Sequence, residues 1–320
     1  MFRFFLLIIL LAVSIFASNL DDLEVKNPKF SLRATGTVQE MIYENSLLYV
    51  GTGNGTIEVF NTKSKKLIKT IAIPKIEDFM GDTIASKIYS IDLFEDKILI
   101  VSQGMKGYRN LWIYENEKLE KLISIEKRFF IQKASFVNTH KIIFALLSNQ
   151  IGLFDIEKKE VTLLIQVSQS SFSHFKLNEN KTKIVTSDES GIVRILSAED
   201  LSLIKSLKSK NLDKVYQLDF KKDKILTAGQ DRKAVFYDNF SSYSLDFDFL
   251  LYSCALSDDA KLGAIAYNEK NEILIFNTNS KKYLYKLTGQ DATLTQILFV
   301  SKEGVFASSD SQIINYWSLK

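Results

Sequence analysis

The chain has few of the residues that build metal, haem and disulfide sites. It contains one Cys, Cys254, and two His, His140 and His174, among 320 residues. A single Cys excludes an internal disulfide and the Cys-x-x-Cys-His haem attachment, and two isolated His offer no converging set of metal ligands. We therefore expect no metal and no cofactor, with Cys254 buried as a packing residue and both His at surface or half-buried positions.

Catalytic and nucleic-acid motifs are also missing. There is no G-x-S-x-G elbow, and the glycine-rich run 51–55 is not followed by the Lys and helix of a phosphate loop. Only 2 Trp are present, whereas the quinone-binding enzymes built from repeats need a Trp motif in each repeat. Lys and Arg number 41 against 38 Asp and Glu, so no strong basic excess indicates a nucleic-acid partner. We expect no catalytic residues and no nucleic-acid binding.

The first 18 residues differ in composition from the rest of the chain. Arg3 precedes an almost unbroken apolar run of 13 residues over 4–16, and the small residues Ala17 and Ser18 follow it. This order is typical of a secretory signal peptide, and the run is shorter than the roughly 20 residues that span a bilayer. With no disulfide and no lipid-bearing Cys, we expect a soluble periplasmic protein cleaved after Ala17 or Ser18. An uncleaved N-terminal anchor is the alternative.

The mature chain contains a repeat. An apolar strand ending in a large apolar residue followed by a small polar or acidic one recurs seven times. The pairs are Phe60-Asn61, Tyr114-Glu115, Phe154-Asp155, Leu196-Ser197, Tyr237-Asp238, Phe276-Asn277 and Trp317-Ser318. Their spacings are 54, 40, 42, 41, 39 and 41 residues. A period of about 40–45 residues with four strands in each unit indicates a β-propeller.

The two ends of the chain indicate how the ring closes. The last unit has three predicted strands, over 293–300, 304–308 and 313–317, and the sequence stops at Lys320 without a fourth. An apolar-alternating strand over 29–34 is left over before the first unit. We predict an all-β, seven-bladed β-propeller whose N-terminal strand completes the last blade and removes its exposed edge. The predicted domains are a signal peptide over 1–18, an N-terminal extension over 19–27 and a monomeric propeller over 28–320.

The repeats resemble those of WD-repeat propellers. That family places a Gly or Asp turn between the second and third strands and ends the third strand in Trp-Asp. The matching turns contain Asp188, Asp231 and Asp310, which the resemblance assigns to tight turns and not to function. The Gly-His pair usual before the first strand is absent, so the family's network of His, Ser and Asp is not carried over complete.

The whole chain also resembles the exported WD-repeat accessory proteins encoded with the periplasmic nitrate reductase in some ε-class proteobacteria. The similarity includes the signal peptide, the seven degenerate repeats, the composition rich in Lys, Ile and Phe, and the segments 35–38 and 49–55. Membership would imply a protein that assembles or docks partners in periplasmic nitrate reduction. It would not imply that the chain carries out the reaction.

Two insertions indicate a binding face. The long first interval places extra residues near 74–83, and the predicted turn 103–110 in the second unit is also enlarged. Both connections emerge on the same face of a propeller, and insertions in repeat proteins often mark the binding face. Aromatic residues, Met and Arg are enriched in protein interfaces. The predicted partner-binding residues are Asp78, Phe79, Met80, Asp82, Met105, Lys106, Tyr108 and Arg109. Tolerated loop growth, with the apolar residues tucked against the blade, is the alternative.

Three functions are consistent with such a fold. The first is a binding module for a protein of the nitrate-reductase system, and the second is a generic periplasmic scaffold. The third is a propeller hydrolase or lactonase with a metal in its central channel, which needs acidic and His side chains there. The segments expected to line the channel, 38–42, 88–91, 131–136 and 215–220, contain mostly apolar, amide, hydroxyl and Lys groups. This composition favours binding over catalysis.

Overall fold

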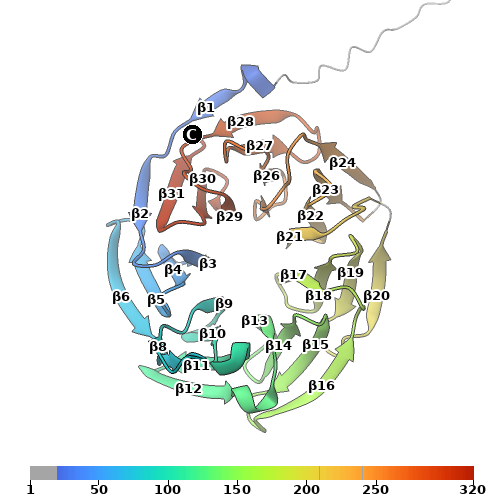
Figure 1. Ribbon diagram of the computed structural model, residues 1–320. Helices are drawn as coiled ribbons and strands as arrows, with labels where there is room; N and C mark the ends of the chain where they lie inside the picture. The colour runs from blue at the N-terminus through green and yellow to red at the C-terminus, as the bar shows by residue number, and fades with distance from the viewer. Residues whose placement is uncertain (1–19, 209, 240) are drawn as a thin grey trace, which may run out of the picture.

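The computed structural model describes residues 20–208, 210–239 and 241–320, which fold into a closed ring of seven blades (Figure 1). The predicted signal peptide lies outside the described residues. Each blade contains four antiparallel strands, of which the first lies nearest the central axis and the fourth lies toward the rim. The predicted fold class is confirmed, and all seven repeated pairs lie at the ends of third strands. No helix in the described ranges is long and apolar enough to cross a membrane.

The strands of the first five blades follow one another in chain order. Blade 1 consists of β3 (Val38–Glu44), β4 (Leu47–Thr52), β5 (Thr56–Asn61) and β6 (Lys66–Ala72). Blade 2 consists of β9 (Ile88–Phe94), β10 (Lys97–Gln103), β11 (Arg109–Glu115) and β12 (Lys118–Ile123). Blade 3 consists of β13 (Ile131–Phe136), β14 (Lys141–Leu146), β15 (Gln150–Asp155) and β16 (Glu160–Gln166). Blade 4 consists of β17 (Phe172–Leu177), β18 (Lys183–Asp188), β19 (Val193–Ser197) and β20 (Leu203–Leu207). Blade 5 consists of β21 (Val215–Lys221), β22 (Lys224–Gly229), β23 (Lys233–Tyr237) and β24 (Ser242–Asp246).

The last two blades receive strands from the N-terminus. Blade 6 consists of β25 (Cys254–Leu256), β26 (Leu262–Ala266), β27 (Ile273–Asn277), β28 (Tyr283–Leu287) and β1 (Glu24–Lys26). Blade 7 consists of β29 (Leu294–Ser301), β30 (Gly304–Ser309), β31 (Ile313–Ser318) and β2 (Phe30–Arg33). The small elements are η1 (Leu20–Asp22), β7 (Ile76–Glu77), β8 (Thr83–Ile84), η2 (Met105–Gly107) and η3 (Ile125–Lys127).

The N-terminal strand closes the ring as predicted. β2 pairs antiparallel with β31, with Leu32 opposite Ile314, and supplies the outer strand that blade 7 lacks. The strand before it, β1, was not predicted as an element. It pairs in parallel with β28 and covers the outer edge of blade 6, so the N-terminal segment ties two neighbouring blades together.

The core is divided into packing layers between neighbouring blades. Each of the seven hydrophobic clusters contains residues from two adjacent blades. The cluster between blades 7 and 1, for example, contains Leu32, Phe306 and Met41. Because a repeat that buries its apolar surface only against its neighbours cannot form its core alone, ring closure matters for every blade.

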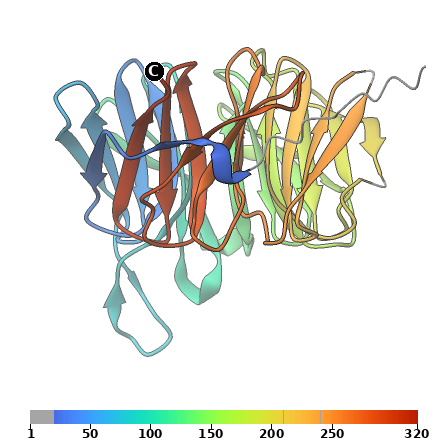
Figure 2. The same cartoon turned by 90° about the horizontal axis from the view of Figure 1, so that it is seen from above.

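The two faces of the ring carry different connections. The turns between second and third strands, and the connections between successive blades, emerge on the face turned toward the viewer in Figure 1. We call this face the loop face. Both predicted insertions lie on it, and they project well beyond the other loops in Figure 2.

Candidate functional site

The connection between blades 1 and 2 is a β-hairpin that projects from the loop face (Figure 2). β7 and β8 pair at its base. At its tip the carboxylate of Asp78 accepts the N–H groups of Met80 (2.8 Å) and Asp82 (3.0 Å), and the N–H of Asp78 donates to the Asp82 carbonyl (2.9 Å). Asp78, a predicted binding residue, therefore braces the turn from inside. Its hydrogen bonds hold the tip in one shape before any partner arrives.

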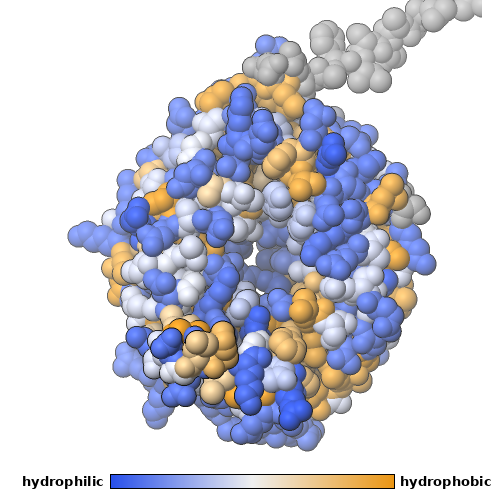
Figure 3. All heavy atoms as spheres, viewed as in Figure 1, coloured by the Kyte–Doolittle hydropathy of each residue, from blue (hydrophilic) through white to orange (hydrophobic). Residues whose placement is uncertain are grey.

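Phe79 and Met80 are the most exposed large apolar side chains at this tip. Their exposed fractions are 95% and 72%. Figure 3 shows orange spheres over the hairpin at the lower left of the loop face, with hydrophilic residues around them. Asp82 is exposed beside them. A large aromatic side chain held out in water, away from any core, is a surface that association with a partner can bury.

The second predicted segment is more closely packed. Met105 and Lys106 are exposed in η2. Tyr108 packs its ring against Phe130, with centroids 4.8 Å apart, and Arg109 lies over the ring of Tyr89, with 3.8 Å from the guanidinium carbon to the centroid. Burial lowers the pKa of Arg109 below its usual value. Tyr108 and Arg109 thus match the alternative of loop growth tucked against the blade, and the exposed binding candidates are Phe79, Met80, Asp82, Met105 and Lys106.

Three exposed apolar residues on the loop face were not predicted. Phe130, Leu147 and Leu212 are 41%, 47% and 72% exposed and lie in connections of blades 2, 3 and 4. Their signal in the sequence is an apolar residue inside a predicted turn, where polar residues are the rule. They extend the apolar character of this face around part of the ring.

Asp188 performs the turn role that the WD-repeat resemblance assigns to it. It is fully buried, and its carboxylate accepts the backbone N–H of Ser190 (2.9 Å), the guanidinium of Arg194 (2.6 Å) and the amide of Asn149 (3.1 Å). Asn149 belongs to the neighbouring blade. One carboxylate therefore closes its own turn, pairs a half-buried cation and links two blades.

Asp231 and Asp310 differ in their surroundings. The carboxylate of Asp231 accepts the N–H of Leu212 (2.8 Å) and lies 3.3 Å from the side-chain amide of Asn211, whose oxygen in turn accepts the hydroxyl of Thr227 (2.7 Å). Asn211 thus links the turn aspartate to a hydroxyl of the second strand. Asp310 is exposed, and its backbone N–H donates to the carbonyl of Thr293 (2.9 Å).

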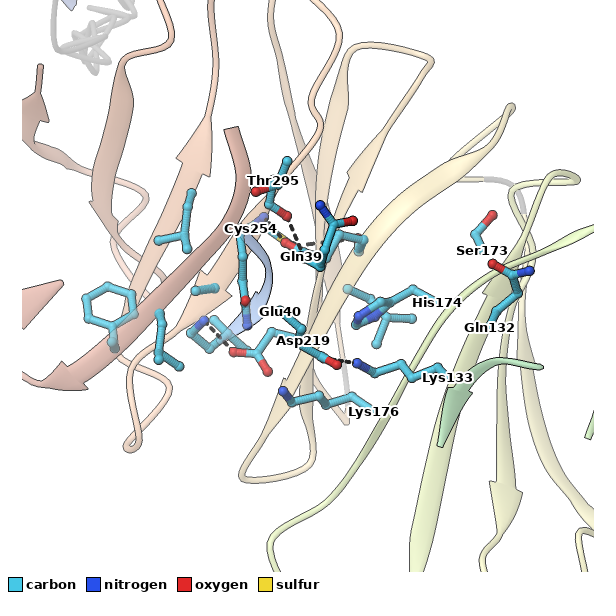
Figure 4. A pocket seen from close by; sticks show the side chains of 18 of the residues that line it. Gln39, Glu40, Gln132, Lys133, Ser173, His174, Lys176, Asp219, Cys254 and Thr295 are labelled. Carbon is cyan, nitrogen blue, oxygen red and sulfur yellow. Dashed lines mark hydrogen bonds and ion pairs between the residues drawn. The ribbon is translucent and has the colours of Figure 1, made fainter. Parts of the chain in front are cut away.

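The central channel contains a cavity of about 270 Å³ lined by the innermost strands. Figure 4 shows Glu40, Asp219 and His174 around it, together with Lys133 and Lys176. Amide, hydroxyl, Lys and apolar groups make up most of the channel lining, as expected, and two carboxylates and an imidazole lie among them. Among the residues that the structure describes, no three His, Cys, Asp or Glu side chains are grouped to hold a metal ion.

The channel carboxylates join neighbouring blades. Glu40 of blade 1 accepts the N–H of Ile91 in blade 2 (2.9 Å) and pairs with Lys133 of blade 3. Asp219 of blade 5 accepts the N–H of Leu256 in blade 6 (2.8 Å). Buried carboxylates held by backbone N–H groups are satisfied acceptors, so their observed contacts are structural.

The strand position of Glu40 is polar around the whole ring. It is the third residue of each innermost strand, or in blade 6 the residue just before the strand. Its occupants are Glu40, Ser90, Lys133, His174, Gln217, Ser253 and Gln296. Gln296 of blade 7, for instance, accepts the N–H of Met41 in blade 1 (2.6 Å) and donates to the Met41 carbonyl (2.9 Å). The channel wall is therefore a belt of polar side chains, and several of them bond to the backbone of the next blade.

Two ionisable groups, His174 in this belt and Cys254 beside it, have pKa values shifted toward the neutral form by their surroundings. Burial, with Lys133 and Lys176 nearby, lowers the pKa of His174 well below its usual value. Burial likewise raises the pKa of the Cys254 thiol well above its usual value. Cys254 is free and buried, so the expected packing role agrees with its position. His174 is half-buried in the channel wall, in line with the expectation of a surface or half-buried His.

We predict that His174 makes the fold sensitive to acid. The unfolded chain takes up a proton at His174 below about pH 6.5, while the folded chain resists it, so stability falls as pH decreases through this value. The loss is at most about 1.4 kcal/mol per pH unit for one proton. Urea unfolding of His174→Gln between pH 5 and 8 should show a shallower pH dependence than the natural chain. His140→Gln, which changes an exposed His, is the control; equal slopes for all three proteins would contradict the prediction.

Comparison with known proteins supports the fold and does not indicate a function. No protein-family model matches the chain, and no curated protein matches it. The crystal structure of the β-propeller domain of Myceliophteria thermophila Cps50 (Swd1) is similar, with a TM-score of 0.74 and 14% identity. The match covers 92% of this chain and 100% of that domain. At this identity the likeness shows the fold, and it agrees with the propeller that the WD-repeat resemblance implies.

Proposed function

We propose that this chain is a periplasmic protein-binding propeller and that it docks a protein component of periplasmic nitrate reduction. The observation that carries the binding role is the projecting hairpin, with Phe79 95% exposed at a braced tip. Aromatic and Met side chains on a rigid support are the usual anchors of protein interfaces. The periplasmic setting and the nitrate-reductase partner are supported by the signal-like N-terminus and by the whole-chain resemblance to the accessory proteins.

The hairpin is suited to insertion into a partner. Complete burial of a Phe or Met side chain contributes roughly 1.5–3 kcal/mol each. The hydrogen bonds of Asp78 fix the tip beforehand, so little conformational entropy is lost when the two side chains enter a pocket. A role in binding and not in catalysis is further favoured by the channel, where the carboxylates of Glu40 and Asp219 are occupied by backbone N–H groups.

The test is capture of partners from periplasmic extract of nitrate-grown cells by the tagged protein. We expect nitrate-reduction proteins to be enriched, and we expect the double variant Phe79→Ser, Met80→Ser to lose at least tenfold of the captured partner with unchanged thermal unfolding. About 1.4 kcal/mol of lost binding energy suffices for a tenfold change. The matched control is Leu203→Ser with Ile204→Ser, which removes two apolar side chains of 60% and 54% exposure from the outer strand β20.

The outcomes separate the rival functions. Enrichment of other envelope proteins, dependent on Phe79 and Met80, would indicate a generic periplasmic scaffold and reject the nitrate-reductase partner. Equal capture by the folded hairpin variant and the natural chain would remove this hairpin as the binding element.

A further inference from the structure

A second site lies on the loop face between blades 5 and 6. A pocket of about 350 Å³ is bounded by the connection that follows β24, by the turn between β26 and β27, and by Leu20 of η1. Its wall residues are Leu20, Asp246, Phe247, Asp248, Phe249, Tyr267, Asn268 and Glu269. It lies outside the central channel and shares no residue with the hairpin.

The floor of this pocket is aromatic and firmly held. Phe247 packs against Tyr267, with centroids 5.9 Å apart, and Tyr267 is 7% exposed. The hydroxyl of Tyr267 donates to the carboxylate of Glu272 (2.8 Å), and the amide of Asn268 donates to the same oxygen (2.7 Å). Both residues of the turn are thereby fixed. The pocket is a preformed feature and needs no rearrangement of its floor to accept a ligand.

The rim of the pocket is acidic, and two of its three carboxylates have no cationic partner in the part of the chain that the structure describes. Of its three carboxylates, that of Asp246 pairs with Lys233 (3.0 Å). Asp248 and Glu269 are exposed and form no salt bridge within the described ranges, and no Lys or Arg lines the pocket. The chain as a whole has a net charge of +3, so this concentration of negative charge is local.

An aromatic floor beneath an acidic rim has a defined chemical preference. A cation is attracted to the face of an aromatic ring and to a carboxylate, and an apolar stem packs on the same rings. Lys and Arg side chains combine these two properties. The pocket is also open toward the loop face, so a side chain presented by a larger surface covers it better than a free small amine, which binds best where most of its surface is enclosed.

We propose that this pocket binds a lysine or arginine side chain of a partner polypeptide. The proposal rests on the proposed protein-binding function and adds a second contact, on the opposite side of the ring from the hairpin (Figure 1). A partner that engages both sites presents an apolar pocket to Phe79 and a basic side chain to Asp248 and Glu269.

The probe is a blocked pentapeptide with arginine between glycine and serine residues, titrated into the full chain and followed by backbone amide shifts in NMR. We expect the amides of Phe247, Phe249 and Asn268 to shift with a Kd on the order of 1 mM, as expected for one side chain. The peptide with citrulline, which has the shape of arginine without its charge, should bind at least fivefold more weakly. The double variant Asp248→Asn, Glu269→Gln should bind at least fivefold more weakly than the natural chain.

A charge-matched variant serves as the control. Glu95→Gln with Asp96→Asn removes two carboxylates from the opposite face and should leave peptide binding unchanged. Absence of shifts at 10 mM peptide, or equal binding of the arginine and citrulline peptides, would overturn the proposal. Agmatine is a free amine that carries a guanidinium group. If it binds more than tenfold more tightly than the peptide, the pocket would be reassigned to small amines. If the chain captures its partner through Phe79 but does not bind the peptide, the proposed function would stand and this inference would be contradicted.

Discussion

Replacing Asp188 with Ala should lower the free energy of unfolding by about 3 kcal/mol, the range found when one partner of a buried ion pair is removed. The change removes the acceptor for the Arg194 guanidinium (2.6 Å) and for the Asn149 amide (3.1 Å). Arg194 is only 14% exposed at its side chain, so its charge would remain largely desolvated and unpaired. Urea unfolding at pH 7 measures the effect.

Asp310 provides the control for this prediction because it occupies the corresponding turn of blade 7 but is exposed. Asp310→Ala should leave stability little changed, as is usual for surface substitutions. A loss below about 1 kcal/mol in Asp188→Ala, or equal losses in both variants, would show that the buried network does not stabilise the turn as we describe.

Removal of the N-terminal strand should have the largest effect of all. A chain that begins at residue 35 lacks β1 and β2, so it exposes the edge of β31 and opens the layer between blades 7 and 1. We expect it to be unfolded or aggregated, because an uncovered edge strand and a broken packing layer affect both neighbours. Circular dichroism and size-exclusion chromatography measure this outcome.

A graded version of the experiment separates ring closure from general truncation damage. A chain that begins at residue 28 keeps β2 and should remain a folded monomer, since it loses only the short parallel strand β1. In the full chain Leu32→Ala should cost about 3 kcal/mol, whereas Val25→Ala should cost little, because Leu32 is 3% exposed and Val25 is 50% exposed. A folded, monomeric chain lacking residues 20–34 would disprove the role of β2 in closure.

The fold was predictable because each repeat has a local sequence pattern that can be recognised without knowledge of distant contacts. Short alternating strands separated by polar turns recur at a nearly constant spacing, and the missing last strand has an obvious replacement at the N-terminus. Details that depend on partners distant in sequence were not predictable. β1 forms only because β28 lies beside it. The predicted strand 251–256 is shortened to β25, because the N–H of Leu251 bonds to Gly229 of the preceding blade and not to its own sheet.

The sequence predicted that the two insertions share one face, and the structure places both on the loop face, where Phe79 and Met80 are exposed. The binding role of this face stays a prediction. Tyr108 packs against Phe130, and Arg109 packs against Tyr89. Both partners lie about 20 residues away in the sequence, so no local pattern predicts these contacts. The pocket beside β24 was not predicted either, because its wall combines three segments that are distant from one another in the sequence.

The channel shows why residue type alone was a weak guide. His174 is half-buried, as expected, but its membership of a polar belt is visible only when the innermost strands are aligned by structure. Six of the seven innermost pairings contain a register shift near this position. Such bulges re-aim side chains, and a sequence pattern with a period of two does not reveal them.

The most direct test of the central claim is photo-crosslinking from the hairpin tip in living cells. A photoreactive benzoyl-phenylalanine placed at position 79 should crosslink one nitrate-reduction protein in the periplasm of nitrate-grown cells, while the same group at position 204 on the rim should not. Such a result would place the partner on the loop face, within reach of the side chain that is 95% exposed. A crosslink to that protein from position 204 and none from position 79 would contradict the account.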